Sequence, residues 1–304
     1  MQQTIILTKR GAGASGLRFT ADMRKSAGPS VLFIHGFPDT FHSFRGQSAA
    51  LHAAGFQTIA PMLRGYEPSS QHPTNDYHAD SLAEDLRDWL DDLGIERAHL
   101  IGHDWGAIVA YAAASRFPER VRSLSLLAVP GIREYLKCLV RYPGQFRRSW
   151  YMFLFQLPLI ARRRLAADDL ALIDRLWAEW SPGWFDEMHP EQRAERLAEV
   201  KTAFRRPGVV NAAIAYYRAI FDFYTPAGLR GFRTLLGKIQ APTLAITGAN
   251  DGCLDTRMFD RMTASRAYSG GLRVERLRNA GHWLHLEQPA AVNRLLLEFL
   301  QSLD

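Results

Sequence analysis

Short apolar runs alternate with helical patterns over the first 130 residues. Runs at 4–7, 31–34, 58–60, 99–101 and 124–127 have the length and composition of strands. Between them, residues 44–54 and 81–93 place apolar side chains at helical spacing, and Asp80 or Ser81 is the expected N-cap of the second helix. This alternation is typical of parallel β-α-β construction.

The pattern changes at Ile132. Aromatic-rich helical segments follow to about Leu229, and alternation returns with strands expected at 243–247 and 273–277 and a closing helix at 289–300. The sequence therefore predicts an α/β fold with a mostly parallel central sheet flanked by helices. Residues 1–131 and 231–304 form its two parts, and residues 132–230 form a helical insertion. An insertion that leaves the carboxyl ends of the strands would cover the crevice where open α/β sheets bind ligands.

The pentapeptide Gly102-His103-Asp104-Trp105-Gly106 lies between the strand at 99–101 and a small-residue helix at 107–114. It has the form of a nucleophile elbow, in which glycines permit a sharp turn, but Asp104 stands where a serine is usual. A carboxylate is suited to displacing a leaving group from saturated carbon, which gives an alkyl ester that an activated water must hydrolyse. Epoxides and alkyl halides fit this chemistry better than simple esters.

Four motifs follow one another along the chain: His35-Gly36-Phe37-Pro38, the elbow, Asp251 after an apolar strand, and Gly281-His282-Trp283. In this order they resemble the α/β-hydrolase superfamily, in its branch of epoxide hydrolases and haloalkane dehalogenases with an aspartate nucleophile. The resemblance covers essentially the whole chain and implies the α/β-hydrolase fold, with residues 132–230 as its cap.

The resemblance also implies roles for the residues of these motifs. Asp104 would be the nucleophile, His282 the general base and Asp251 the carboxylate that orients the imidazole. Asp255 and His285 remain the respective alternatives. The main-chain N–H groups of Phe37 and Trp105 would form the oxyanion hole, and both side chains are expected at the substrate pocket. His35, at a strand end, is expected to be structural.

The leaving group decides between the two activities of the branch. An epoxide oxygen needs an O–H donor, which a phenol supplies at neutral pH, whereas a halide needs N–H donors. Residues 149–156 and 215–218 resemble the cap segments that carry the ring-opening tyrosines of epoxide hydrolases. By this match Tyr151 and Tyr217 are the expected donors, with Tyr216 as the alternative to Tyr217.

Two departures from the pattern qualify the resemblance. Phe37 stands where one haloalkane dehalogenase group has an asparagine that binds halide, which counts against dehalogenation. In the other direction, both families have the tryptophan at position 105, whose indole N–H could bind halide, and Trp150 could offer a second indole N–H. After Gln156 the chain continues with Leu157-Pro158-Leu159 and lacks the glutamate that eukaryotic epoxide hydrolases commonly place soon after this glutamine. The prediction is an epoxide hydrolase that forms a vicinal diol without cofactor or metal. The alternatives are a haloalkane or haloacid dehalogenase, an ester or lactone hydrolase, and a non-catalytic ligand-binding protein.

Composition narrows the partners. The 304 residues carry a net charge of +6, but their basic clusters are short and accompany no recognised nucleic-acid module, so no nucleic-acid partner is expected. No apolar run reaches the roughly 18 residues of a membrane span, and no secretory signal is apparent. Cys138 and Cys253 match no metal-site spacing, which favours reduced thiols in a cytoplasmic protein. The expected substrate is a small, largely apolar molecule, and monomer and homodimer both remain open.

Overall fold

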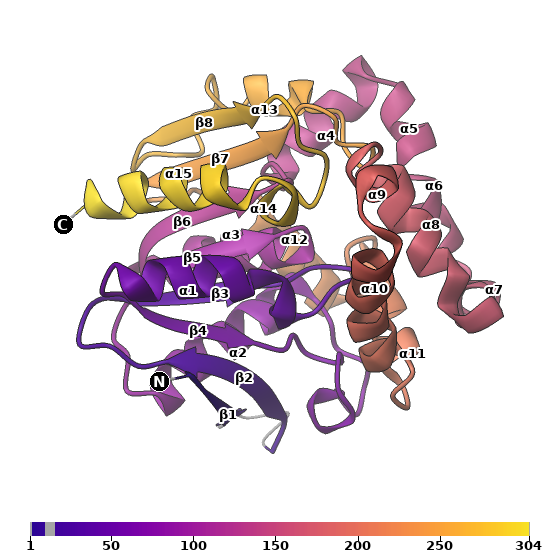
Figure 1. The fold of residues 1–304 in the computed structure, drawn as a ribbon, viewed down its shortest axis with the longest axis horizontal. Helices are drawn as coiled ribbons and strands as arrows, with labels where there is room; N and C mark the ends of the chain where they lie inside the picture. The colour runs from indigo at the N-terminus through magenta and orange to yellow at the C-terminus, as the bar shows by residue number, and fades with distance from the viewer. Residues whose placement is uncertain (1, 10–15, 304) are drawn as a thin grey trace.

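The computed structural model describes residues 2–9 and 16–303, and these contain one eight-stranded sheet. The strands are β1 (Gln2–Thr8), β2 (Arg18–Arg24), β3 (Ser30–Ile34), β4 (Gln57–Pro61), β5 (Ala98–His103), β6 (Val121–Leu127), β7 (Thr243–Gly248) and β8 (Leu272–Leu277). Their order across the sheet is β1-β2-β4-β3-β5-β6-β7-β8 (Figure 1). Pairs β1–β2 and β2–β4 are antiparallel and the others are parallel. The predicted mostly parallel α/β sheet is therefore confirmed.

Every predicted apolar run lies within a strand. The central strands β3, β5, β6 and β7 have the clearest sequence signal because they are buried on both faces, whereas the edge strands β1 and β8 are partly exposed. β5 is the extreme case, since all six of its residues are buried. β2 was not predicted. Its sequence RFTADMR places charged residues among the apolar ones, its first residue is exposed and its last is only partly buried. The strand depends on pairing with β1 and β4 rather than on a local pattern.

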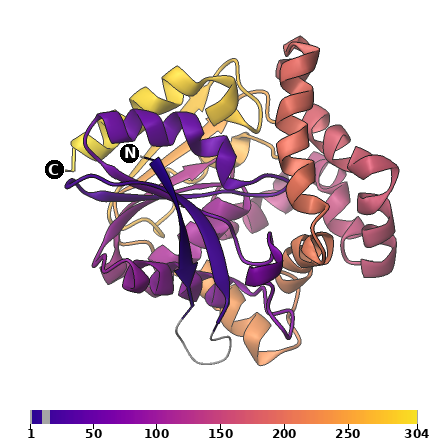
Figure 2. The same ribbon diagram turned by 60° about the horizontal axis from the view of Figure 1, so that its bottom comes forward.

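Helices cover both faces of the sheet (Figure 2). α1 (Arg45–Ala53) and α15 (Pro289–Gln301) pack together on one face, while α2 (Ala79–Asp92), α3 (Trp105–Arg116) and α12 (Pro226–Leu235) pack together on the other. The predicted start of α2 was wrong: the helix begins at Ala79 after His78. Ser81 is the third residue of the helix and does not cap it, and its hydroxyl donates to Asp76 Oδ2 at 2.6 Å.

The chain between β6 and β7 is a helical insert, and its helices before α12 stand beyond the carboxyl ends of the strands (Figure 1). Its helices are α4 (Ile132–Arg141), α5 (Gly144–Arg148), α6 (Trp150–Leu154), α7 (Pro158–Ala166), α8 (Ala171–Trp180), α9 (Trp184–Glu187), α10 (Pro190–Phe204), α11 (Val209–Ala219) and α12. The predicted boundary at residue 230 falls inside α12, and the division into core and cap stays a prediction. Two short helices complete the fold, α13 (Arg257–Asp260) and α14 (Leu284–Glu287). Among the described helices, none is both long and apolar enough to cross a bilayer.

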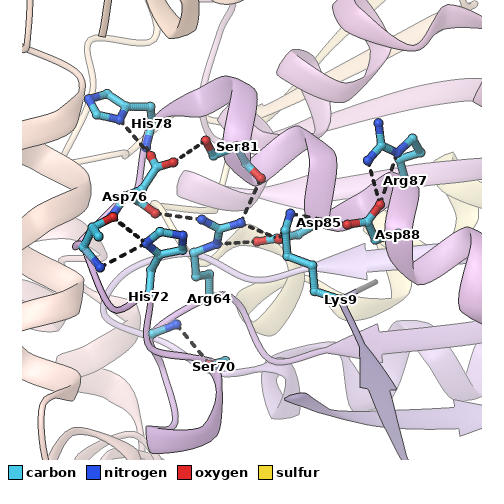
Figure 3. A network of polar contacts seen from close by, with 12 residues as sticks. Lys9, Arg64, Ser70, His72, Asp76, His78, Ser81, Asp85, Arg87 and Asp88 are labelled. Atoms are coloured by element: carbon cyan, nitrogen blue, oxygen red, sulfur yellow. Dashed lines mark hydrogen bonds and ion pairs between the residues drawn. The ribbon is translucent and has the colours of Figure 1, made fainter. Parts of the chain in front are cut away.

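A buried ionic network joins the loop after β4 to α2 (Figure 3). Arg64 Nε donates to Asp85 Oδ2 at 2.6 Å, and Lys9 Nζ donates to Asp85 Oδ1 at 3.0 Å. Burial opposes the charge of the Arg64 guanidinium, but the Asp85 carboxylate raises its pKa overall, so the guanidinium stays charged. The carbonyl of Arg64 accepts a hydrogen bond of 2.7 Å from the hydroxyl of Tyr216 on α11. The network thereby fixes one insert helix against the sheet domain.

Candidate active site

Asp104 occupies the sharp turn between β5 and α3. Its backbone has φ 51° and ψ −120°, a conformation that non-glycine residues adopt only where the surroundings impose it. A Cβ at Gly102 would collide with the carbonyl oxygen of Gly106, and a Cβ at Gly106 would collide with that of Ile34. The two glycines therefore let the turn pack against the end of β3, and the carboxylate of Asp104 projects from the turn.

The structure brings Asp104, His282 and Asp251 together, all of them buried. Asp104 Oδ2 lies 3.5 Å from His282 Nε2, and His282 Nδ1 lies 3.0 Å from Asp251 Oδ2. The other oxygen of Asp251 accepts backbone N–H groups from Cys253 at 2.7 Å and Leu254 at 2.9 Å. These two bonds orient the carboxylate toward the imidazole.

The two alternatives lie elsewhere. Asp255 forms an ion pair of 2.6 Å with Arg257. His285 is on α14, where its ring stacks on Phe44 with centroids 4.8 Å apart. Geometry therefore favours Asp251 and His282 over these neighbours.

The pKa of His282 is set by burial and by two neighbouring carboxylates. Burial alone would lower the pKa of its imidazole, but the carboxylates of Asp251 and Asp104 together raise the pKa to about 10. The imidazolium is thus the dominant form at neutral pH while both carboxylates are ionised. Neutralising Asp104 removes part of this stabilisation, lowers the pKa of His282 and favours the neutral imidazole, which is the form that accepts a proton.

The backbone around Asp104 supplies the expected donors. Phe37 N–H donates to Asp104 Oδ1 at 2.8 Å. Trp105 is the first residue of α3, so its N–H has no acceptor within the helix. Oδ1 is thus held by the main chain and Oδ2 is the oxygen that faces His282. The Trp105 side chain lines the cavity described next. The Phe37 ring, which was also expected at the pocket, is not among the lining residues and packs against the ring of Phe155.

Asp104 opens into a narrow cavity of about 70 Å³ between the sheet domain and the insert. The lining is almost entirely apolar or aromatic and comprises Asp104, Trp105, Ile108, Val129, Ile132, Tyr135, Tyr151, Met152, Tyr217, Ile220, Phe221, Cys253 and Leu254. Both predicted tyrosines belong to this lining. Their ring centroids are 5.6 Å apart, and burial raises the pKa of both phenols well above its usual value. Both hydroxyls therefore stay protonated.

The hydroxyls of these tyrosines differ in their partners. Tyr151 Oη lies 3.3 Å from the thiol of Cys253. Tyr217 Oη is buried and has no partner of good hydrogen-bond geometry among the described residues. Tyr216, the alternative to Tyr217, instead directs its hydroxyl to the carbonyl of Arg64. Tyr217 is accordingly the member of this pair whose O–H is available to a ligand.

Hydrogen bonds from the insert hold both loops of the site. The carbonyl of Trp180, at the end of α8, accepts the N–H of Gly252 at 3.0 Å and the N–H of His282 at 3.1 Å. Arg148 donates to the carbonyl of Asp251 at 2.8 Å. The insert therefore positions the loops of Asp251 and His282 and also covers the cavity.

Several buried residues beside the site make contacts that the sequence did not predict. The sequence favoured a reduced thiol at Cys253 and gave it no place in the site, but the residue lines the cavity. Behind His282, ligand-type atoms of Asp39, His103 and His285 lie within 4.8 Å of one another, a donor set that a transition metal could accept. His103 also donates from Nε2 to the carbonyl of His282 at 2.9 Å. Burial raises the pKa of Asp39 to about 7 and lowers that of His103 to about 3.

His35 has the structural role expected of it. Its Nε2 accepts the N–H of Leu63 at 3.0 Å and its Nδ1 donates to the carbonyl of Gly36 at 3.0 Å. Burial lowers the pKa of the ring to about 4, so it remains neutral. The imidazole thus joins the loop after β3 to the loop after β4.

Comparison with known proteins identifies the family to which the chain belongs. Residues 29–289 match the model of the alpha/beta hydrolase fold family. Epoxide hydrolase A of Mycobacterium tuberculosis is 32% identical over 324 aligned positions, which cover 98% of each chain. Human epoxide hydrolase 4 is 30% identical over 95% of this chain and 77% of its own length. The crystal structure of epoxide hydrolase A from Mycobacterium thermoresistibile superposes with a TM-score of 0.81 at 28% identity, covering 99% of this chain and 98% of the other. The chain is a hydrolase of the alpha/beta hydrolase fold family.

Proposed function

We propose that the protein is an epoxide hydrolase that converts an apolar epoxide to a vicinal diol through a covalent ester on Asp104. The observation that carries the proposal is the cavity itself. It sets two protonated phenols, one of which has no acceptor for its O–H among the described residues, in the same apolar space as a buried carboxylate. An alkoxide leaving group needs such O–H donors. The names of the relatives agree with this assignment.

In the first step, Oδ2 of Asp104 attacks an epoxide carbon and the C–O bond of the ring breaks. Oδ1 remains on the Phe37 N–H and becomes the ester carbonyl oxygen. The leaving oxygen takes a proton from Tyr217 or Tyr151. Because the ester has consumed the charge of Asp104, the pKa of His282 falls, and the proton that it releases restores the phenol.

In the second step, neutral His282 takes a proton from a water that attacks the ester carbonyl. The N–H groups of Phe37 and Trp105 stabilise the oxyanion. The ester C–O bond then breaks, the diol leaves with its second hydroxyl protonated, and Asp104 is again a carboxylate facing protonated His282. The helices at 132–230 act as the cap that supplies both tyrosines and excludes bulk water.

The covalent step can be tested with His282→Gln, which retains the nucleophile and lacks the base. Mixed with a panel of epoxides, this variant should accumulate an alkyl-enzyme whose intact mass rises by the mass of the epoxide. The matched Asp104→Asn variant should show no adduct. In a single turnover of the parent enzyme in ¹⁸O-water, the label should enter Asp104. Label found only in the diol would refute the nucleophile assignment.

A dehalogenase is the second candidate because the Trp105 side chain lines the cavity. The second indole considered from the sequence is committed elsewhere, since Trp150 Nε1 donates to Glu179 at 3.1 Å. Tyr151→Phe separates the two activities: it should strongly slow diol formation and leave any halide release comparatively unchanged. Halide release from haloalkanes that exceeds diol formation from epoxides would favour the dehalogenase.

A further inference from the structure

The positive charge of the chain is concentrated in one stretch of the insert. Residues 132–167 contain eight basic residues and a single acidic one, Glu134, and therefore carry +7, whereas the whole chain carries +6. The remainder is thus close to neutral, at −1. Glu134 is buried and hydrogen-bonded to Ser265, so it offers little negative charge to the surface of this stretch.

The same stretch exposes apolar side chains. Of the thirteen large apolar residues exposed among the described positions, seven lie within 132–167. On α4, Leu136 and Val140 are four residues apart and share one stripe, and Lys137 and Arg141 form the adjacent stripe. All four are exposed, and Val140 is 90% exposed. α4 therefore presents an amphipathic face to solvent.

α7 repeats this arrangement. Leu159 is 71% and Ile160 51% exposed, and the next turn presents Arg162, Arg163 and Arg164, all exposed. Spacings of three and four residues place these guanidinium groups beside the two aliphatic side chains on the same helix faces. Mixed aliphatic and basic surfaces of this kind are the signature of helices that lie in a lipid headgroup layer.

The helices between them connect the two faces. The exposed rings of Phe146 and Phe153 stack with centroids 6.4 Å apart, and Tyr135 on α4 lies 3.1 Å from Ser149 at the start of α6. Figure 1 shows α4, α5, α6 and α7 following one another along the outer edge of the insert. We define the docking face as the exposed side chains of these four helices.

We infer that the docking face binds the surface of an anionic lipid bilayer. A nucleic acid is a poor partner, because its charged backbone would not bury the aliphatic side chains of the face. A second copy of the chain is also a poor partner, because two stretches of charge +7 would repel each other. An anionic bilayer satisfies both halves of the face, because its headgroups attract the basic side chains and its acyl boundary takes up the aliphatic ones. Tyr135 and Met152, on α4 and α6, also line the cavity, so docking brings the wall of the cavity to the layer where apolar molecules partition. Docking itself does not depend on which reaction the cavity supports.

The test is sedimentation of the full chain with vesicles. Vesicles of phosphatidylcholine containing about one third phosphatidylglycerol should bind the protein, pure phosphatidylcholine should bind it far less, and added salt should weaken binding. Replacing Arg162, Arg163 and Arg164 by Gln should reduce the partition coefficient roughly 100-fold, at about fivefold for each charge. The matched control replaces Lys25, Arg266 and Arg278 by Gln. These are exposed basic residues outside residues 132–167, so this variant should bind like the parent.

A second variant distinguishes lipid from an acidic macromolecule. Leu159→Asn with Ile160→Asn keeps every charge and should lower binding to anionic vesicles roughly tenfold, because the buried aliphatic area is lost. All variants are surface changes, and unchanged melting temperatures will show that they fold. Equal binding to both vesicle types, no binding to either, an unaffected Leu159/Ile160 variant, or a parent dimer that buries this face in solution would each overturn the inference.

Discussion

Adjacent tyrosines on α11 provide the sharpest test of the site, because their hydroxyls have opposite environments. Tyr217 Oη is buried in the cavity and has no partner of good hydrogen-bond geometry within residues 2–9 and 16–303, whereas Tyr216 Oη donates to the carbonyl of Arg64 at 2.7 Å. Both phenol rings are almost fully buried, at 2% and 1% exposure. Substituting either by Phe therefore changes one oxygen and little else.

The expected effects have opposite signs for stability. Tyr217→Phe removes a buried hydroxyl that has no partner, which should stabilise the fold by about 1 kcal/mol. Tyr216→Phe loses a hydrogen bond and leaves a buried carbonyl without its donor, which should cost about 2 kcal/mol. For activity the order reverses: Tyr217→Phe should lower kcat/KM on epoxides roughly 100-fold, the lower range for loss of a general acid, and Tyr216→Phe should leave it nearly unchanged.

Thermal melting and steady-state diol formation measure the two quantities on the same preparations. The stability changes correspond to shifts of roughly +2 °C and −4 °C in Tm for a chain of this size. A destabilised Tyr217→Phe protein would mean that its hydroxyl has a structural partner. If Tyr216→Phe were the variant to lose activity, the assignment of the donor would be wrong.

Three further predictions concern buried charge. Burial raises the pKa of Asp39 from 3.8 to about 7, so folding loses stability as the pH rises between these values, and Asp39→Asn should be the more stable protein above pH 7 in thermal melts. Arg64→Met leaves Asp85 with only Lys9 as its cation in the network of Figure 3 and should cost about 4 kcal/mol in urea unfolding. The raised pKa of His282 contributes stability that is complete below pH 6.5 and lost as the pH rises toward 10; His282→Gln should flatten this part of the pH–Tm curve.

Most of the sheet could be predicted because its central strands are buried on both faces and leave continuous apolar runs. β5 and β7, which precede Asp104 and Asp251, are of this kind. β2 escaped prediction because charged residues interrupt its pattern and its partners are distant in sequence. The start of α2 was misplaced because the helix begins after His78, which makes no capping bond with its side chain, so Asp80 and Ser81 lie inside its first turn.

The site was predictable as a set of motifs but not as a set of orientations. Nothing local distinguishes Tyr216 from Tyr217, since one residue along a helix turns a side chain by about 100° and only tertiary packing decides which one faces the cavity. Asp251 and Asp255 are similarly equivalent as turn residues until the backbone N–H groups of Cys253 and Leu254 fix one of them. Cys253 itself could not be assigned, because its contact with Tyr151 joins two elements far apart in the chain.

The charge balance around His282 explains how one imidazole serves both steps of the proposed reaction. It faces two carboxylates, Asp251 at 3.0 Å and Asp104 at 3.5 Å, and only the second is consumed when the ester forms. Asp104→Asn removes the same charge without substrate and keeps the size of the side chain. In this variant the pKa of His282 should fall from its high value toward the neutral range, measured by NMR titration of the imidazole Cε1 proton. Asp255→Asn, which changes a carboxylate paired with Arg257, should leave that pKa unchanged. An identical titration in Asp104→Asn and the parent would show that Asp104 does not control the base, and the proposed timing of proton release would fail.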